Sequence, residues 1–164
     1  MAEAMAAAAR KAAAKQAVVA EVLSAGAGFG AQPANGQLGN LDQIQATFQD
    51  QQQRLWVGTT AGVYLIDPQL QRRQLPPPLH QLFEKLRIWQ ISQSADGELW
   101  FATSSGLVQV SADLTRQRLW SMQDVDYPTK TSRYLEVRTI LPVAGGIWLA
   151  TSDGLFLLDM TTKQ

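Results

Sequence analysis

The chain has 164 residues, enough for one ordinary domain or for one domain with an appendage. Its 14 basic residues balance 14 acidic ones, which argues against a nucleic-acid-binding protein, because that class needs a basic stripe facing the phosphates. The absence of cysteine excludes disulfides and thiolate sites, and a single histidine, His80, excludes a metal site built on two histidines.

The first 30 residues differ in composition from the rest of the chain. Residues 1–23 lack glycine and proline and are rich in alanine, so they predict a helix, which the glycines from Gly26 onward end. Four interpretations of the 1–30 segment stay open: an appended helix, a flexible extension, the product of a start codon upstream of the real one, or a degenerate secretory signal. A secretory signal needs an unbroken apolar core, and here Glu21 interrupts it. Residues 31–40 are predicted to be a linker, and no stretch approaches the roughly 20 apolar residues of a membrane helix.

The remaining residues, 41–164, contain one pattern three times. Residues 55–63, 99–107 and 147–155 align without gaps, and their tryptophans recur at intervals of roughly 45 residues, the length of a four-stranded propeller blade. The sequence therefore predicts an all-β fold, a partial β-propeller of about three antiparallel blades with the third one incomplete. The three blades are predicted at residues 41–84, 85–134 and 135–164.

Each recurring position has a physical explanation. The strand around each tryptophan is apolar on both faces, as expected of a sheet sandwiched between two neighbours. The small residue two positions after the tryptophan lets the adjacent sheet approach. A threonine then ends the strand, and a glycine three residues later predicts a tight turn with positive φ. These structural positions are Trp56, Thr59, Gly62, Trp100, Thr103, Gly106, Trp148, Thr151 and Gly154.

Further strands are predicted around each tryptophan strand. Apolar and β-branched residues predict an inner strand before it and a returning strand after it, with weaker outer strands in the first two copies. Three consecutive prolines, at positions 76–78, predict that the connection over residues 76–85 is a loop, with a short helical turn at 80–85 as the alternative for its second half. The predicted inner strands are 44–48, 88–92 and 137–141, the returning strands 63–66, 107–110 and 155–158, and the outer strands 72–75 and 117–120.

The repeat resembles the two-component regulator propeller repeat, whose pattern runs Leu-Trp, apolar, small, Thr, two variable residues, Gly-Leu. Residues 99–107 and 147–155 match it, and 55–63 departs from it only at Val63. The resemblance implies the extracytoplasmic sensing part of a bacterial signalling protein, such as a hybrid histidine kinase or a diguanylate cyclase, with glycan fragments as typical ligands. It also implies a periplasmic location, or a cytoplasmic one if the 1–30 segment is no signal.

A second resemblance, carried by residues 96–101, is to virginiamycin-lyase-like propellers, a group that includes lyases relying on histidine and a metal. Because His80 stands alone in a predicted loop, the lyase is the weaker alternative. No nucleophile elbow, phosphate-binding loop or zinc spacing is present, so we expect no catalytic residues, no metal and no cofactor.

A ligand site is expected where equivalent positions of the blades differ. One position after the first apolar residue of the inner strand, the three copies carry Gln45, Trp89 and Arg138, which together could stack on and hydrogen-bond a polar or glycan ligand. The alternative is that Trp89 is core packing and Arg138 a solvated charge at the rim.

The sequence thus predicts a non-catalytic, ligand-binding sensory module, as part of a longer sensor. The alternative function is a scaffold that binds proteins through its blade faces. About three blades are too few for a closed ring of four to eight, so the partners expected are missing blades of a longer chain or a second copy. Neither nucleic acid nor a membrane span is expected in this chain.

Overall fold

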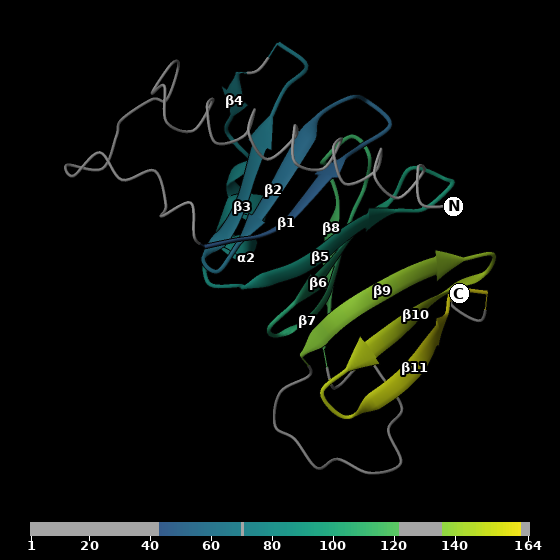
Figure 1. Ribbon diagram of the computed structural model, residues 1–164. Coiled ribbons are helices and arrows are strands. Elements are labelled where there is room, and N and C mark those ends of the chain that lie inside the picture. Colours follow the sequence, from purple (N-terminus) through teal and green to yellow (C-terminus); the bar gives the residue numbers. More distant parts are fainter. Residues whose placement is uncertain (1–42, 70, 122–135, 162–164) are drawn as a thin grey trace, which may run out of the picture.

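The computed structural model describes residues 43–69, 71–121 and 136–161, which form three antiparallel sheets in a row (Figure 1). This confirms the predicted all-β, partial propeller. The first sheet has the order β1-β2-β3-β4, the second β5-β6-β7-β8, and the third β11-β10-β9. The strands are β1 (Ile44–Gln49), β2 (Leu55–Thr59), β3 (Gly62–Ile66), β4 (Arg72–Arg73), β5 (Ile88–Gln93), β6 (Leu99–Thr103), β7 (Gly106–Val110), β8 (Gln117–Trp120), β9 (Val137–Val143), β10 (Gly146–Thr151) and β11 (Gly154–Asp159).

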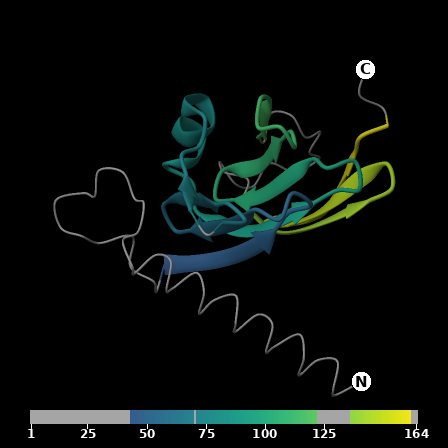
Figure 2. The same ribbon diagram turned by 90° about the horizontal axis from the view of Figure 1, so that it is seen from above.

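The first strand of each sheet lies against the first strand of the next. β5 contacts both β1 and β9, so these three strands form the inner rim of the arc (Figure 1). Figure 2 shows the sheets from above, following one another in chain order. This is the arrangement of propeller blades, with successive strands of each sheet lying progressively farther from the axis.

The recurring threonine and glycine make the same hairpin in every blade. Gly62, Gly106 and Gly154 have φ of 111°, 135° and 138°, which confirms the predicted turns. The hydroxyl of each threonine donates to the carbonyl of its glycine, at 2.8–3.0 Å, and accepts the N–H of a turn residue. A threonine recurs at this position because one hydroxyl satisfies two backbone groups of the turn.

The blades stack through the two faces of the tryptophan strands. Trp56 of β2 meets Phe101 of β6 edge to face, with ring centroids 5.4 Å apart. A Cβ added at Gly58 would stand 2.6 Å from Cγ2 of Ile88 in the next blade, so the small residue is required for the close approach of the sheets. Two buried clusters result, one between the first and second blades and one between the second and third.

The indole N–H of the tryptophan is held by the preceding turn. Trp56 Nε1 donates to the buried carboxylate of Asp50 at 2.9 Å, and Trp100 Nε1 donates to the hydroxyl of Ser94 at 3.2 Å. A buried indole N–H needs such a partner, so the turn and the core are tied together.

The segment after β4 differs from the prediction. Residues 76–78 were expected in a loop, with a helical turn only from residue 80, but helix α2 (Pro77–Phe83) already begins at the second of the three prolines. The first N–H groups of a helix have no intrahelical acceptor, so proline costs nothing there. The helix buries Leu79 and Phe83 in the cluster between the first two blades. β4 is also shorter than expected, two residues in place of four.

Other predictions concern residues outside the described ranges or are not tested. The predicted helix and linker, residues 1–40, lie outside the described residues, and the blade boundaries stay predictions. Within the described residues, no helix has the length and apolar content to cross a membrane.

Acid should weaken the turns that close the outer hairpins. Hydrogen bonds from the Ser111 and Thr115 hydroxyls, then from the Thr115 N–H, lower the pKa of Asp113 from 3.8 to about 2. The N–H of Gln71 and then Arg73 lower the pKa of Asp67 in the same way. Both carboxyl groups have a lower pKa in the folded chain than in the unfolded chain. Their ionised forms therefore stabilise the fold above about pH 4, and this contribution is lost as the pH falls toward 2.

The measurement is a carboxyl-detected NMR titration of Asp113, together with urea unfolding between pH 6 and pH 2. We expect a titration midpoint near 2 and a shallower loss of stability with acid in Asp113→Asn. A midpoint near the ordinary 3.8 would contradict the role given to the turn hydroxyls.

Candidate functional site at the inner strands

The three predicted site residues occupy one structural position, a β-bulge near the start of each inner strand. The register of β1 on β2 shifts between Ile44 and Ala46, and that of β5 on β6 shifts between Ile88 and Gln90. The third blade has the corresponding shift in the pairing of β9 with β10. The residues that the strand pairing skips at these shifts are Gln45, Trp89 and Arg138. A bulge frees a side chain from the alternation of the strand and re-aims it.

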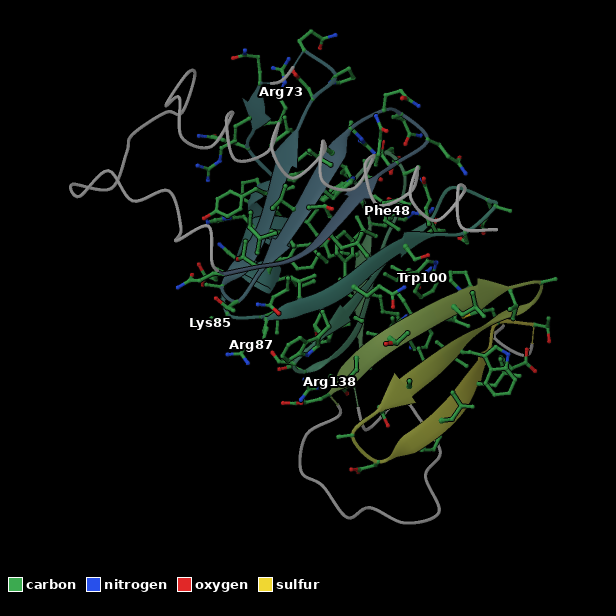
Figure 3. The ribbon with its side chains drawn as sticks, in the orientation of Figure 1. Phe48, Arg73, Lys85, Arg87, Trp100 and Arg138 are labelled. Carbon is green, nitrogen blue, oxygen red and sulfur yellow. The ribbon has the colours of Figure 1, made fainter. Side chains whose placement is uncertain are left out.

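Two of the three residues come together. The Arg138 guanidinium lies 4.1 Å from the centroid of the Trp89 ring, and the Arg87 guanidinium lies 5.1 Å from the same centroid. Figure 3 shows Arg87 and Arg138 at the neighbouring starts of β5 and β9. Arg138 also pairs with Glu136 at 2.6 Å. We call Arg87, Trp89, Glu136 and Arg138 the bulge cluster.

The bulge cluster combines features of both sequence interpretations. Trp89 is half-buried and packs against the cluster between the second and third blades, as the core-packing alternative expected. Its indole Nε1 is nevertheless buried without a hydrogen-bond acceptor among the described residues. Arg138 is exposed, yet a carboxylate and an aromatic ring both hold it. The result is a positioned pair of cations around one indole.

Gln45 does not join the other two. It is exposed, and among the described residues no hydrogen bond or ring contact connects it to Trp89 or Arg138. The blade that carries it is separated from β9 by the whole of β5. The ligand role predicted for all three residues stays a prediction.

Sequence reasoning missed three residues of this region. Arg87 and Glu136 each lie two positions before a bulge residue, where their charge was the available signal. Gln90 gave no signal, but its amide binds the backbone of the next inner strand: Oε1 accepts from the Ile140 N–H at 2.9 Å, and Nε2 donates to the Ile140 carbonyl at 3.0 Å. This double hydrogen bond fixes β9 relative to β5, and with it Arg138 relative to Trp89.

A cavity of about 400 Å³ lies away from the inner strands, between β3, β4 and α2. His80 lines it from the exposed side of the helix, and Arg72 lies over the Tyr64 ring at 4.6 Å. Arg73, at the same wall, is paired with Asp67 at 2.6 Å. No group of three or more histidine, cysteine or acidic side chains that could hold a metal occurs in the described part of the chain.

In comparisons with known proteins, the chain matches one family model and several solved structures of similar fold. A model of the two component regulator propeller matches residues 38–61, which include the first tryptophan repeat. No curated protein matches the chain.

Among solved structures, PorZ, an essential surface component of the type-IX secretion system of Porphyromonas gingivalis, aligns over 71% of this chain with a TM-score of 0.58 and 16% identity. The extracellular domain of a proposed hybrid two component system of B. thetaiotaomicron, BT3049, aligns over 80% with a TM-score of 0.55 and 23% identity. The extracellular domain of BT4673 from B. thetaiotaomicron aligns over 82% with a TM-score of 0.57 and 18% identity.

The chain spans less than a fifth of the length of these solved chains, 17%, 19% and 17% respectively. At such low sequence identities, the structural similarity shows a shared fold and nothing further. The family model matches the first repeat, at residues 38–61, and the described residues form the stacked blades of a partial β-propeller.

Proposed function

We propose that the chain is a non-catalytic, ligand-binding part of a sensory propeller in a bacterial signal-transduction protein, on the extracytoplasmic side of the membrane. The observation that carries the proposal is the bulge cluster, because Arg87 and Arg138 converge on one indole at the inner rim. The matched repeat and the two extracellular sensor domains of similar fold support the sensory context.

The ligand of the bulge cluster is a small polar molecule or a glycan fragment. Guanidinium groups offer several N–H donors in a plane, which suits carboxylate and hydroxyl oxygens, and an indole offers an apolar face for a sugar ring. A ligand oxygen would replace Glu136 as the partner of Arg138. The guanidinium could then leave the Trp89 ring, so ligand binding would change the environment of that indole.

Fluorescence titration with a panel of neutral and acidic oligosaccharides tests the proposal. We expect at least one of them to change the tryptophan emission. In calorimetric titrations, whose signal does not depend on the Trp89 indole, we expect Arg138→Ala and Trp89→Phe to weaken its binding at least tenfold. Arg116→Ala is the matched control, because Arg116 is an exposed arginine on the outer side of the second blade, paired only loosely with Glu98 at 3.8 Å. Equal binding by all three variants, or no binding at millimolar concentrations, would contradict the proposal.

A scaffold that binds proteins through blade faces is the second candidate. One observation favours it: the face of the third blade that contains Trp148 is apolar and exposed. The chemistry of that face is distinct from the bulge cluster, so the two functions are separable by mutation.

A further inference from the structure

The outer strand of the first blade stops short of its counterpart in the second blade. β8 pairs with the last four residues of β7, whereas β4 pairs only with Leu65 and Ile66 of β3. Val63 and Tyr64, which precede them in β3, have no β4 residue opposite them in the described structure. The prolines from Pro76 onward exclude further pairing, because proline lacks the N–H that a strand donates.

The cavity of about 400 Å³ lies where this outer strand stops. Val63 and Tyr64 of β3 line one wall, and Gln74 and Leu75, which follow β4, line the next. Helix α2, which lies beside β3, forms a further wall (Figure 1). In the second blade, β8 continues beside the start of β7, so the cavity results from a departure of the first blade from the repeat. Its volume is within the range of small-molecule sites.

Helix α2 has an apolar side and a polar side. Leu79 and Phe83, which lie one helical turn apart, are buried in the cluster between the first two blades. His80 and Glu84, also one turn apart, line the cavity. Because the apolar side anchors the helix in the core, the same packing places the Glu84 carboxylate at the cavity.

Strand β4 supplies a positioned cation to the same cavity. The Arg72 guanidinium lies over the Tyr64 ring, 4.6 Å from its centroid, and both residues are half-buried. An aromatic ring holds a guanidinium by its flat face, whereas the N–H groups that suit carboxylate oxygens lie along its edge. The neighbouring Arg73 is engaged differently, because it is paired with Asp67 at 2.6 Å. The cavity thus brings together a cation from β4 and a carboxylate from the end of α2.

We propose that this cavity binds a free α-amino acid with an apolar side chain. Arg72 binds the carboxylate of the ligand and Glu84 its ammonium group, while the ligand side chain lies against the half-buried Val63 and Leu75. A ligand with only one charge would remove water from the other charge of the cavity without replacing it, so the pair selects a ligand that carries both. The site shares no residue with the bulge cluster, so it stands or falls independently of the function proposed above.

Calorimetric titration of the full chain with leucine and three related compounds tests the proposal. We expect leucine to bind at one site per chain. Leucinamide, which lacks the carboxylate, and N-acetylleucine, which lacks the ammonium group, should bind at least tenfold more weakly. Glycine, which has no side chain to place against Val63 and Leu75, should also bind at least tenfold more weakly. Equal binding of all four compounds, or no binding of leucine at millimolar concentrations, would overturn the proposal.

Two substitutions test the two charges one at a time. Arg72→Gln is expected to weaken leucine binding at least tenfold and to leave the binding of leucinamide unchanged, because leucinamide has no carboxylate to lose. Glu84→Gln is expected to weaken leucine binding to the same extent and to leave the binding of N-acetylleucine unchanged. The matched controls are Arg116→Gln and Asp96→Asn, which remove the same charges at exposed positions of the second blade and should bind leucine as the wild type does.

Far-UV circular dichroism of each variant establishes that the sheets are intact. If Arg72→Gln does not fold, Ala61→Phe, at an exposed residue that lines the cavity, is expected to exclude leucine by filling the space. Leucine binding that survives Glu84→Gln or Ala61→Phe undiminished would overturn the proposal. The bulge-cluster variants Arg138→Ala and Trp89→Phe are expected to bind leucine normally, and a loss of leucine binding in them would place the amino acid at the bulge cluster and overturn this site.

Discussion

Replacing Gly106 with alanine is expected to lower the free energy of unfolding by more than about 4 kcal/mol, a loss that single substitutions rarely cause. Gly106 has φ of 135°, and a Cβ there would stand 2.2 Å from the carbonyl oxygen of Trp120 in β8. The substitution therefore combines backbone strain with a collision against the backbone of the neighbouring strand. Because Trp120 cannot move without breaking its pairing with Leu107, β8 would detach from the second blade.

Gly154→Ala is the matched control for this prediction. Gly154 has nearly the same φ, 138°, but among the described residues a Cβ there would touch only the ring of Phe156, at 3.5 Å, an ordinary contact. The strain alone should cost about 1–3 kcal/mol. Urea unfolding followed by tryptophan fluorescence measures both variants, and equal losses would mean that the close approach of β8 contributes nothing.

Asp50→Ala is expected to cost about 3–5 kcal/mol, the range for removing one partner of a buried charge pair. The Asp50 side chain is 0% exposed and accepts from Arg54 Nε at 2.6 Å and from Trp56 Nε1 at 2.9 Å. It also accepts from the backbone N–H groups of Gln52 and Arg54. Alanine would leave these donors without an acceptor, including the fully buried indole of Trp56.

The equivalent substitution in the second blade, Ser94→Ala, provides the comparison. Ser94 accepts from Trp100 Nε1 at the longer distance of 3.2 Å and carries no charge, so its removal should cost about 1 kcal/mol. Thermal or urea unfolding of the two variants checks the difference. A loss for Asp50→Ala no larger than that for Ser94→Ala would show that the carboxylate is replaceable by solvent.

The three tryptophan turns illustrate how far local sequence predicts structure. The strand, the threonine and the positive-φ glycine were all predictable, because each depends on residues within a few positions of one another. The residue that accepts the indole N–H differs between blades, since it is Asp50 in the first blade and Ser94 in the second. The corresponding turn of the third blade has Ala144, whose side chain has no acceptor. A search for identical residues misses a role that different residues fill.

Helix α2 and the bulge cluster could be predicted only in part. Three prolines exclude a strand interior, and that inference was correct. Whether a helix starts at Pro77 depends on the hydrophobic cluster between the first two blades, in which Leu79 and Phe83 are buried. Trp89 and Arg138 were expected at equivalent positions, and the sequence placed them in neighbouring blades. Their contact at 4.1 Å also requires the bulges and the hydrogen bonds of Gln90 to Ile140, which join residues 50 positions apart.

The sequence by itself determined the repeat, the strand positions, the hairpin turns and the all-β class, because these follow from side-chain alternation and backbone preference over a few residues. The tertiary structure decided which of the residues at equivalent positions of the repeat are buried and which are exposed. Trp56, Trp100 and Trp148 share one local pattern, yet two are buried and one is exposed. The reason is physical: a strand encodes which way its side chains point, whereas the next blade determines whether anything lies there.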